Sequence, residues 1–591
     1  MPRSTFAFSN FTAGELSPRL DGRIDLPKYF SGCKTLENMI VHPHGGATRR
    51  PGTRFISATK NNGEARLVPF EFSTTQTYVL EFGNQYMRVY KDGGQVLNSG
   101  TTVEIATPYS AAEANELKFA QSADVLFIVH PSHQPRKLSR TSHVNWTLTL
   151  YAPTNNPFTS TNNFPSTVTF FEERLVFAGT NADPQKLFFS KSGDFEDMTT
   201  GTNATDGMTF TIGSDQVNAI RYIKGLRTLL IGTTGGEFVA TASSSAEPIT
   251  PTNIQIKRQA GYGTSEVDAL LAGNRILFVQ RAGKKVRELV FDFDTDGYIA
   301  PDLTILAEHI GGSGVGTGFT NWTYQQEPDS IVWVVRSDGV LTGMTYQRGE
   351  NVVAWHRHIL GGAFSGGDAV VESVAAISNS TASSKGEDTL YMIVKRTIDG
   401  GTKRYIEYLQ PFDFGSNIED AWFLDSGLVY SGSAVNSLSG LSHLEGQTVS
   451  ILANGATHAD KVVSSGAITL DRSATKVIVG LKYTSKLQTM RIESGSAEGV
   501  AQGKVKRIHE IVARFFETVG AEIGSSSVQT DLIPFRDSSM AMDQPVDLFT
   551  GDKSIEFASD YETDNFVYIQ QTQPLPMSVT ALFPQLNTYD G

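Results

Sequence analysis

Cysteine is almost absent from the chain, because Cys33 is the only one among 591 residues. No intrachain disulfide can form, so apolar burial and backbone pairing must hold the fold, and we expect folding in a reducing compartment. Long apolar runs are also missing, and none approaches the roughly 20 residues that span a bilayer. The first seventeen residues lack the apolar segment of a secretory signal. The sequence therefore predicts neither stable membrane insertion nor secretion.

Charge is sparse, at 19% of residues, whereas aromatic residues reach 10% and glycine numbers 55. This composition is typical of a globular, turn-rich protein and not of a disordered one. The length suggests roughly three or four domain-sized units. The net charge is -13, but residues 1–60 hold nine basic and four acidic residues, so the other 531 residues carry -18. Such an acidic bulk disfavours tight DNA binding and suits a surface that DNA slides past.

Short strand-turn-strand patterns recur along most of the chain. Runs rich in Val, Ile, Phe, Tyr and Thr alternate with polar residues and end at Gly, Asn, Asp or Pro. A spacing of about 40–55 residues between such hairpins is typical of a β-propeller, and several β-sandwiches in series are the alternative. The predicted hairpins lie at residues 77–96, 124–140, 174–198, 227–240, 274–298, 330–347 and 388–409.

The pattern changes after about residue 410. Residues 444–483 alternate strictly and carry an Asn-Gly pair at the first turn, which predicts a compact antiparallel sheet or small barrel. Residues 504–520 fit either a helical stripe or a strand, and the surrounding β pattern favours the strand. Residues 566–586 give two strands interrupted by prolines. The expected fold is mainly β, with a β-propeller-like domain and a β-sandwich or small-barrel platform domain.

The predicted domain boundaries follow from these patterns. An N-terminal strap, residues 1–60, contributes to the platform; residues 61–410 form the propeller-like domain; residues 411–591 form the rest of the platform.

One acidic loop could bind a metal ion. Asp292, Asp294 and Asp296 alternate ahead of Gly297, as ligands of a calcium loop do. The twelfth position of such a loop, which should supply a bidentate Glu, is Leu303, so the ligand set falls short. Charged residues at the tip of a β-turn are the alternative. We therefore predict no metal site for the chain, and these three aspartates are the weak candidate for a calcium site.

No other pattern predicts chemistry. His42 with His44, and His356 with His358, offer two ligands each where zinc needs three or four, so we expect structural or surface roles. The glycine-rich residues 311–318 lack the Gly-Lys-Ser/Thr of a phosphate loop and indicate a turn. Serine-hydrolase and zinc-protease motifs are absent from the sequence. We predict no catalytic residue, no cofactor and no enzymatic activity.

Residues 37–56 combine turn formers with arginines. Gly45 and Gly46 permit positive φ, and prolines on either side fix an extended, turned strap. Arg49, Arg50 and Arg54 would then project guanidinium groups toward carboxylates of a neighbouring acidic subunit or adaptor. Contact with DNA phosphates is the competing use. These five residues are the predicted interface candidates.

Several phrases resemble podophage tail nozzle proteins, also called tail tubular protein B. The resemblance runs nearly end to end, and the order of the phrases makes it specific. They are Gly14-Glu15-Leu16-Ser17-Pro18, Asn38, residues 43–53, 174–180, 192–195, 296–298 with 302–304, Trp355-His356-Arg357-His358, Arg404-Tyr405-Ile406-Glu407, 548–552 and Pro574-Leu575-Pro576.

The resemblance implies a function for the whole chain. Nozzle proteins form a hexameric distal tail tube below a ring of adaptor proteins, bind tail fibres or spikes, retain the packaged genome and conduct viral DNA during ejection. They have no known reaction of their own. The implied location is the virion tail, assembled in the host cytoplasm, and the implied partners are five further copies, the adaptor ring, a fibre or spike, and DNA in passage through an acidic lumen.

Two alternatives from other classes stay open. A propeller could be a glycan-degrading enzyme, depolymerase- or sialidase-like, with carboxylates and Arg in its pocket. It could also be a carbohydrate-binding module that recognises a receptor. Turnover of polysaccharide favours the first, and glycan binding by an isolated monomer favours the second.

Overall fold

The computed structural model of the chain describes residues 3–213, 216–244, 247–312, 314, 316–378, 386–493, 495–496, 499–500, 502–541 and 544–588. Strands dominate, which confirms the predicted mainly β fold. The chain divides into two compact units. Unit 1 comprises Met1–Ala58, Gln325–Glu372 and Ser380–Gly591, and unit 2 comprises Thr59–Tyr324 and Ser373–Asn379.

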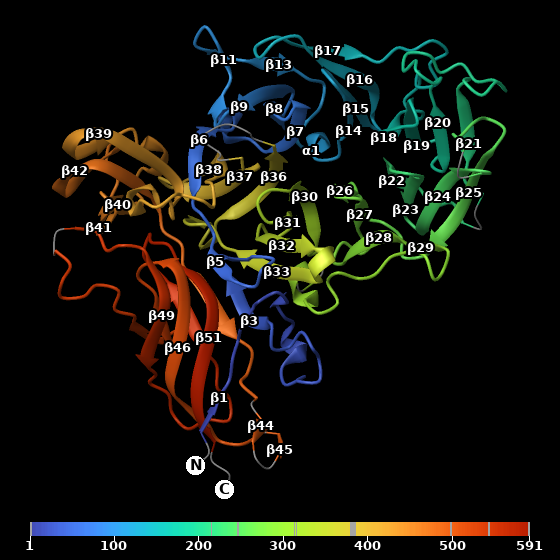
Figure 1. Ribbon diagram of the computed structural model, residues 1–591. Coiled ribbons are helices and arrows are strands. Elements are labelled where there is room, and N and C mark those ends of the chain that lie inside the picture. Colours follow the sequence, from blue (N-terminus) through green and yellow to red (C-terminus); the bar gives the residue numbers. More distant parts are fainter. Residues whose placement is uncertain are drawn as a thin grey trace. The chain divides into compact units, whose positions relative to one another are not determined.

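Within the described residues of unit 2, five antiparallel sheets of four or five strands follow one another in chain order. Figure 1 shows them around an arc, with β7, β14, β18, β22 and β26 on its inner side. The first sheet consists of β7 (Ala65–Ser73), β8 (Gln76–Gly83), β9 (Tyr86–Lys91) and β10 (Gly94–Gln95) with β13 (Glu104–Ala106), and the second of β14 (Lys118–Ser122), β15 (Val125–His130), β16 (His133–Arg140) and β17 (Trp146–Leu150). The third consists of β18 (Pro165–Phe171), β19 (Arg174–Thr180), β20 (Lys186–Phe189) and β21 (Met208–Thr211), and the fourth of β22 (Ile220–Gly225), β23 (Leu229–Thr233), β24 (Gly236–Ala242) and β25 (Ile254–Ala260). The fifth consists of β26 (Leu270–Ala272), β27 (Arg275–Val279), β28 (Val286–Asp292) and β29 (Gly297–Ile299).

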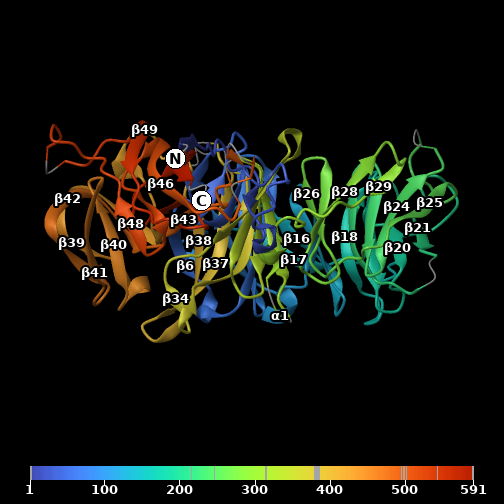
Figure 2. The ribbon, with the colours of Figure 1, turned by 90° about the horizontal axis from the view of Figure 1, so that it is seen from below.

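Apolar clusters join each of these sheets to the next. One cluster packs Phe127 and Val129 of the second sheet against Leu175 and Phe177 of the third. Others join the first sheet to the second, the third to the fourth, and the fourth to the fifth. Figure 2 shows the sheets that contain β18, β24 and β28 standing beside one another. A four-stranded sheet buries only one face alone, so face-to-face stacking completes the core and gives the predicted propeller-like domain.

Short elements fill the connections of unit 2. The helix α1 (Ala111–Ala114) begins at Ser110, whose hydroxyl accepts from the Glu113 amide while the Glu113 carboxylate accepts from the Ser110 amide. The remaining elements are η2 (Lys60–Asn62), β11 (Leu97–Asn98), β12 (Thr101–Thr102), η3 (Glu308–Gly311) and the residues of β30 (Phe319–Gln325) and β36 (Val370–Ile377) that belong to this unit.

Unit 1 is built on three sheets whose strands come from distant parts of the chain. The strand order of the first is β31 (Ile331–Arg336), β32 (Leu341–Gln347), β33 (Val352–His358), β2 (Gly14–Glu15), β3 (Gly32–Glu37), β43 (Ser485–Thr489), β50 (Tyr568–Gln571), β47 (Glu522–Ser526) and β48 (Gln529–Leu532). The order of the second is β37 (Thr389–Ile398), β38 (Gly401–Leu409), β6 (Thr53–Ala58), β39 (Asp425–Ser439), β42 (Ala467–Leu481), β40 (Thr448–Ala453) and β41 (Ala456–Val462). The order of the third is β4 (Met39–Val41), β5 (Ala47–Arg49), β51 (Ser578–Thr588), β46 (Lys506–Thr518) and β49 (Phe549–Glu556), and β1 (Arg3–Thr5) also pairs with β51.

Smaller elements complete unit 1. They are η1 (Pro18–Leu20), β34 (Ala363–Phe364), β35 (Gly367–Asp368), η4 (Arg348–Glu350), η5 (Ile418–Asp420), η6 (Ser442–Leu444), β44 (Gly495–Ser496) and β45 (Gly499–Val500).

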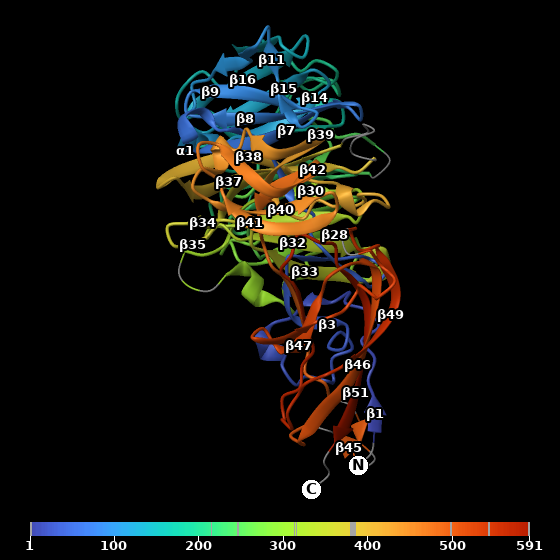
Figure 3. The ribbon, with the colours of Figure 1, turned by 90° about the vertical axis from the view of Figure 1, so that its left-hand side faces the viewer.

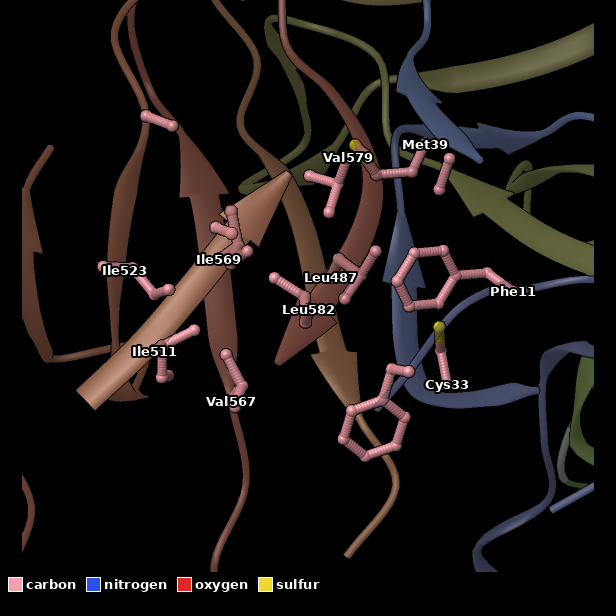
Figure 4. Packing of buried hydrophobic residues seen from close by; sticks show 14 of the residues in the cluster. Phe11, Cys33, Met39, Leu487, Ile511, Ile523, Val567, Ile569, Val579 and Leu582 are labelled. Carbon is pink, nitrogen blue, oxygen red and sulfur yellow. The ribbon is translucent and has the colours of Figure 1, made fainter. Parts of the chain in front are cut away.

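The two chain ends share one core in unit 1. Strands β1, β46 and β51 lie side by side in Figures 1 and 3. Figure 4 shows Phe11, Cys33 and Met39 from the N-terminal segment pointing toward Leu487 and Leu582 from the C-terminal one. This buried contact places residues before 58 in the same unit as the residues after 411.

The division of the chain differs from the predicted boundary at residue 410. Residues 325–372 and 380–410 belong to unit 1, whereas the sequence analysis assigned them to the propeller-like domain. Backbone pairing explains the difference, because β38 pairs with β6 and Trp355 of β33 pairs with Gly14 of β2. These ladders tie the segment to the N-terminal strap.

The predicted strands are confirmed in detail. Each of the seven hairpins forms an antiparallel pair. Residues 504–520 form the strand β46, in which Phe515 is buried and Phe516 is half exposed. An amphipathic helix would have buried both rings on one face. The alternation of buried and exposed side chains therefore shows that this segment is a strand. Among the described residues, no helix is long and apolar enough to cross a membrane.

Candidate functional site: a buried polar clasp in unit 1

The strap at residues 37–56 forms a tight hairpin of β4 and β5. Gly45 adopts φ +113°, and a Cβ there would lie 2.8 Å from the Cβ of Asn10, so glycine is required on two counts. Gly46 does not use positive φ. The turn sets the register that carries Arg49 and Arg50 from β5 into the interior of unit 1.

Arg50 forms a buried, two-pronged ion pair with Asp425. Its Nη1 and Nη2 atoms each lie 2.9 Å from a carboxylate oxygen of Asp425, and both side chains are 1% exposed or less. The same carboxylate accepts from the amides of Thr53 at 3.1 Å and Gly361 at 2.8 Å. Four donors therefore satisfy one buried carboxylate, which is the condition under which a buried ion pair holds.

Arg49 is satisfied mainly by backbone carbonyls. Its Nη1 donates to the carbonyls of Gln573 and Leu575, the latter at 3.0 Å, and its Nη2 donates to the carbonyl of Tyr483 at 2.8 Å. The guanidinium also lies 4.6 Å from the centre of the Tyr483 ring. Burial lowers the pKa of Arg49 from its usual value. Arg49 therefore fastens the strap to the segment between β50 and β51.

These positions correct the expectation that the arginines project toward another subunit. Arg49 and Arg50 are each 1% exposed, and their partners belong to their own chain. Arg54 is half-buried in β6, with its guanidinium 5.9 Å from the centre of the Trp422 ring. The cause lies in Asp425, a carboxylate 375 residues away that no local pattern connects to Arg50.

Asn38 and Glu15 fasten the strap to β33. The Asn38 amide group donates to the carbonyls of Ile359 at 3.0 Å and Thr484 at 2.8 Å, and its side-chain oxygen accepts from the Ile359 amide at 3.0 Å. Glu15 is 1% exposed and accepts from Arg357 Nε at 2.7 Å and from the Leu36 amide at 2.8 Å. Both polar side chains are thus buried with their hydrogen bonds made.

A second buried ion pair extends the network. The Thr53 hydroxyl donates to Glu407 at 2.6 Å, and Glu407 is paired with Arg396, which is fully buried. Arg396 Nε donates to the carbonyl of Gly361 at 2.7 Å, and the Gly361 amide donates to Asp425. We call the connected set of Glu15, Asn38, Arg49, Arg50, Thr53, Arg357, Arg396, Glu407, Asp425 and Tyr483 the clasp.

The aspartates of the calcium candidate lie at a hairpin tip. Asp292 ends β28, and its carboxylate accepts from the Thr295 amide at 3.1 Å. Asp294 and Asp296 are exposed. Within the described part of the chain, the one group of three converging metal-type ligands is Glu113, His130 and His133, and these aspartates form no such group. The arrangement fits the turn-tip alternative.

The Glu113–His130–His133 group was missed by the sequence analysis, because it joins α1 to the β15–β16 hairpin. His133 Nε2 lies 3.0 Å from Glu113, and His130 Nε2 lies 3.1 Å from Glu116. The Ser132 amide donates to His130 Nδ1 at 3.0 Å, which occupies that lone pair. Hydrogen bonds within the group therefore explain its geometry, and we assign no metal to it.

The paired histidines have structural partners. His42 bridges Asp329 at 2.9 Å and Thr48 at 2.8 Å, and its ring stacks on His44. His356 Nδ1 lies 2.7 Å from His358 Nε2, and both are buried. The predicted glycine turn at 311–318 lies partly outside the described residues, at positions 313 and 315.

No protein-family model and no curated protein matches the chain. Among solved structures, the WD40 repeats of RRP9 cover 61% of this chain and 99% of their own, with 10% identity and a TM-score of 0.38. The Cps50 (Swd1) β-propeller domain of Myceliophteria thermophila covers 60% and 99%, with 9% identity and a TM-score of 0.34. BamB from Moraxella catarrhalis covers 61% and 98%, with 10% identity and a TM-score of 0.31. These superpositions are too loose to indicate a function, so the sheet order itself defines the propeller-like domain.

Proposed function

We propose that the chain is a structural component of a podovirus tail, forming the distal tube or nozzle ring that retains the genome and conducts DNA during ejection. One observation carries the proposal. Phrases that resemble the nozzle family, hundreds of residues apart in sequence, meet in the clasp. They supply Glu15, Asn38, Arg49, Arg50, Arg357 and Glu407. A further phrase supplies Leu575, whose carbonyl accepts from Arg49.

The chemistry of the clasp favours a structural role for those phrases. The Arg50–Asp425 and Arg396–Glu407 ion pairs are buried and satisfied by their own chain, and Arg50 and Asp425 are inaccessible to a substrate. Buried polar networks of this kind fix one arrangement of distant segments, because a half-made network leaves charges unpaired in the interior. A tail tube that holds compressed DNA needs subunits whose segments stay in one fixed arrangement.

The charge of the chain supports the same function. A net charge of -13 in an assembled ring would oppose adhesion of DNA to the channel wall, since like charges repel across a narrow passage. The proposed partners are five further copies, an adaptor ring above, and a fibre or spike at the side. Closed rings are the common outcome when one surface patch binds a different patch of the next copy.

Sedimentation velocity of the purified full chain, combined with a polysaccharide turnover assay, tests the proposal. We expect a species of six times the chain mass and no release of sugar ends. A monomer that cleaves polysaccharide would overturn the proposal and favour the glycan-degrading alternative. A monomer that binds glycans without cleavage would favour the receptor-recognition alternative.

A further inference from the structure

Unit 2 contains a half-open cavity of about 990 Å³ on the inner side of its sheets. Its lining includes Arg66 of β7, Lys118 of β14, Ser166 of β18 and Arg221 of β22, and it extends over residues 264–271 and 319–322. Sites for small molecules in proteins have volumes of roughly 300–1,000 Å³. The cavity is therefore large enough for a ligand of several heavy atoms.

Cationic side chains outnumber acidic ones around this cavity. The lining contains five cations, which are Arg66, Lys118, Arg221, Lys224 and Arg281. It contains three carboxylates, which are Glu116, Glu266 and Asp268. The lining side chains have a formal net charge of +2, whereas the net charge of the whole chain is -13. The cavity is therefore positively charged within an acidic protein.

The carboxylates are already engaged by other groups. Asp268 pairs with Lys224 at 2.7 Å, and Glu266, which is 77% exposed, pairs with Arg221 at 3.0 Å. Glu116 points its carboxylate at His130. Three cations of the lining are thus left without an ion pair to any described residue. Arg281 is exposed to solvent, and the other two are shielded from it.

Those two cations are Lys118 and Arg66. Lys118 is only 8% exposed and donates to the backbone carbonyl of Arg221. Arg66 donates to the carbonyls of Ala114 at 3.3 Å, Asn115 at 2.9 Å and Leu117 at 2.7 Å. Among the described residues, no carboxylate lies within salt-bridge distance of either cation. Asp268 attracts both cations from beyond that distance, but it is paired directly with Lys224. A buried charge without a directly paired counter-ion is costly, and a bound anion would reduce that cost.

Titration of the two side chains reflects the same imbalance. Burial lowers the pKa of Lys118, Asp268 raises it, and the cations Lys224, Arg221 and Arg66 lower it, and together these effects bring the pKa to about 8. Burial also lowers the pKa of Arg66 to about 10. Both shifts show that burial outweighs the attraction of Asp268 at these two cations.

Unused hydrogen-bonding atoms lie at the same place. In the described part of the chain, Arg66 Nε, Arg221 Nε and the Ser265 hydroxyl are buried without a hydrogen-bond partner. Asp268 Oδ1 is a buried acceptor in the same condition. Buried polar atoms are nearly always paired in folded proteins, so an unpaired set beside a cavity indicates a missing partner. Three donors and one acceptor suit an oxyanion that also carries a hydroxyl.

We propose that this cavity binds a small oxyanion bearing phosphate or carboxylate groups, held by Lys118, Arg66 and Arg221. Guanidinium groups recognise both kinds of oxyanion through paired N–H donors. Asp268 accepts from a hydroxyl of the ligand, as hydrogen phosphate or a hydroxy-carboxylate provides. The site belongs to unit 2 alone and does not depend on the tail function proposed above.

Isothermal titration of the full chain at pH 8 with inorganic phosphate, and separately with citrate, tests the site. We expect saturable one-site binding of at least one probe, with a Kd of about 1 mM or tighter. Phosphate binding alone identifies a phosphate ligand, and citrate binding alone identifies a carboxylate ligand. Absence of saturable heat with both probes overturns the proposal.

Two variants separate the cavity from the general surface charge. Lys118→Met should weaken binding at least about tenfold, whereas Lys257→Met, on the exposed face of β25, should leave it unchanged. Equal binding by Lys118→Met and the wild type would contradict the site. Methionine replaces an unpaired buried cation, so we expect this variant to fold.

Proton uptake by the wild-type chain on anion binding provides a test that needs no variant. Because the pKa of Lys118 is about 8, an anion that binds beside it should raise that pKa and draw a proton from the buffer. The heat measured at pH 8 should then change with the ionisation enthalpy of the buffer. Binding without proton uptake at pH 8 would contradict contact with Lys118.

Discussion

At the scale of single residues, Asp425 is the centre of the clasp. Its carboxylate holds Arg50, Thr53 and Gly361 through four hydrogen bonds. Asp425→Ala should lower the free energy of unfolding by about 3–5 kcal/mol, because it leaves the Arg50 charge buried and unpaired. Chemical denaturation followed by tryptophan fluorescence measures the loss.

An exposed pair provides the matched control for this variant. Arg23 and Asp25 form a similar two-pronged ion pair on the surface, where both side chains are more than half exposed. Asp25→Ala should leave the unfolding transition unchanged. Equal effects of Asp25→Ala and Asp425→Ala would show that burial of the clasp contributes nothing.

Gly14 is a second residue that the clasp requires. It adopts φ +66°, and a Cβ there would lie 2.5 Å from the Trp355 amide nitrogen. Gly14→Ala should cost roughly 2–5 kcal/mol, since a left-handed backbone and a close contact between β2 and β33 add together. Thermal unfolding measures the effect.

Gly440 separates the two causes. It adopts φ +88° with open space around the position of a Cβ. Gly440→Ala should therefore show only the conformational cost, about 1–2 kcal/mol. If both variants were equally stable, close packing of the strap on β33 would play no part.

His356 predicts a dependence of stability on pH. Burial lowers the pKa of His356 from 6.5 to about 3, whereas the unfolded chain takes up a proton near pH 6.5. Between these values the unfolded state binds more protons, so stability should fall as pH falls from about 6.5 toward 3, by up to about 1.4 kcal/mol per pH unit. Urea unfolding at pH 7, 6 and 5 measures this slope.

The slope should be smaller in His356→Gln than in the wild type. His44→Gln is the control, because His44 is exposed. An unchanged slope in His356→Gln would mean that this imidazole is accessible to protons in the folded chain.

At the scale of elements, protection from hydrogen exchange should follow sheet position. Strand β51 is paired on one side with β46 and on the other with β5 and β1. Strand β48 pairs only with β47 and exposes 64% of Leu532. Amides of β51 should exchange near the global unfolding limit and those of β48 orders of magnitude faster. Comparable rates would contradict the central place of β51.

The sequence predicted elements well and their partners poorly. Strand-turn-strand segments were readable because alternation and Gly or Asn turns are local signals, as in the β40–β41 hairpin with its Asn454-Gly455 turn. The surrounding β pattern favoured a strand over a helix at residues 504–520, and the outward Phe516 of β46 confirms it. The boundary at 410 differed because β6 pairs with β38 across some 350 residues, which no window of sequence reveals.

The site shows the same limit. The sequence predicts Arg49 and Arg50 as contacts to a neighbouring subunit or adaptor, whereas both are buried against partners in their own chain. Asp425 carries no motif, and the carbonyls of Gln573 and Leu575 are backbone atoms that any residue would offer. The cavity of unit 2 was invisible for a related reason, because Lys118 and Arg221 come from different sheets and converge only in the folded unit.

At the scale of the whole molecule, buried contacts between distant segments hold each unit in one arrangement. Distant segments of unit 1 are fastened by buried ion pairs, and unit 2 is completed by sheets stacked face to face. Both devices resist local opening, since separating any one segment exposes charges or apolar faces together. Such a design suits a tube wall that bears load.

Electron cryo-microscopy of the purified full chain tests the proposed tail ring. We expect closed rings of six copies around a continuous hole, with acidic side chains lining the hole. A population of single copies, or a ring whose hole is lined by lysine and arginine, would contradict the proposed function.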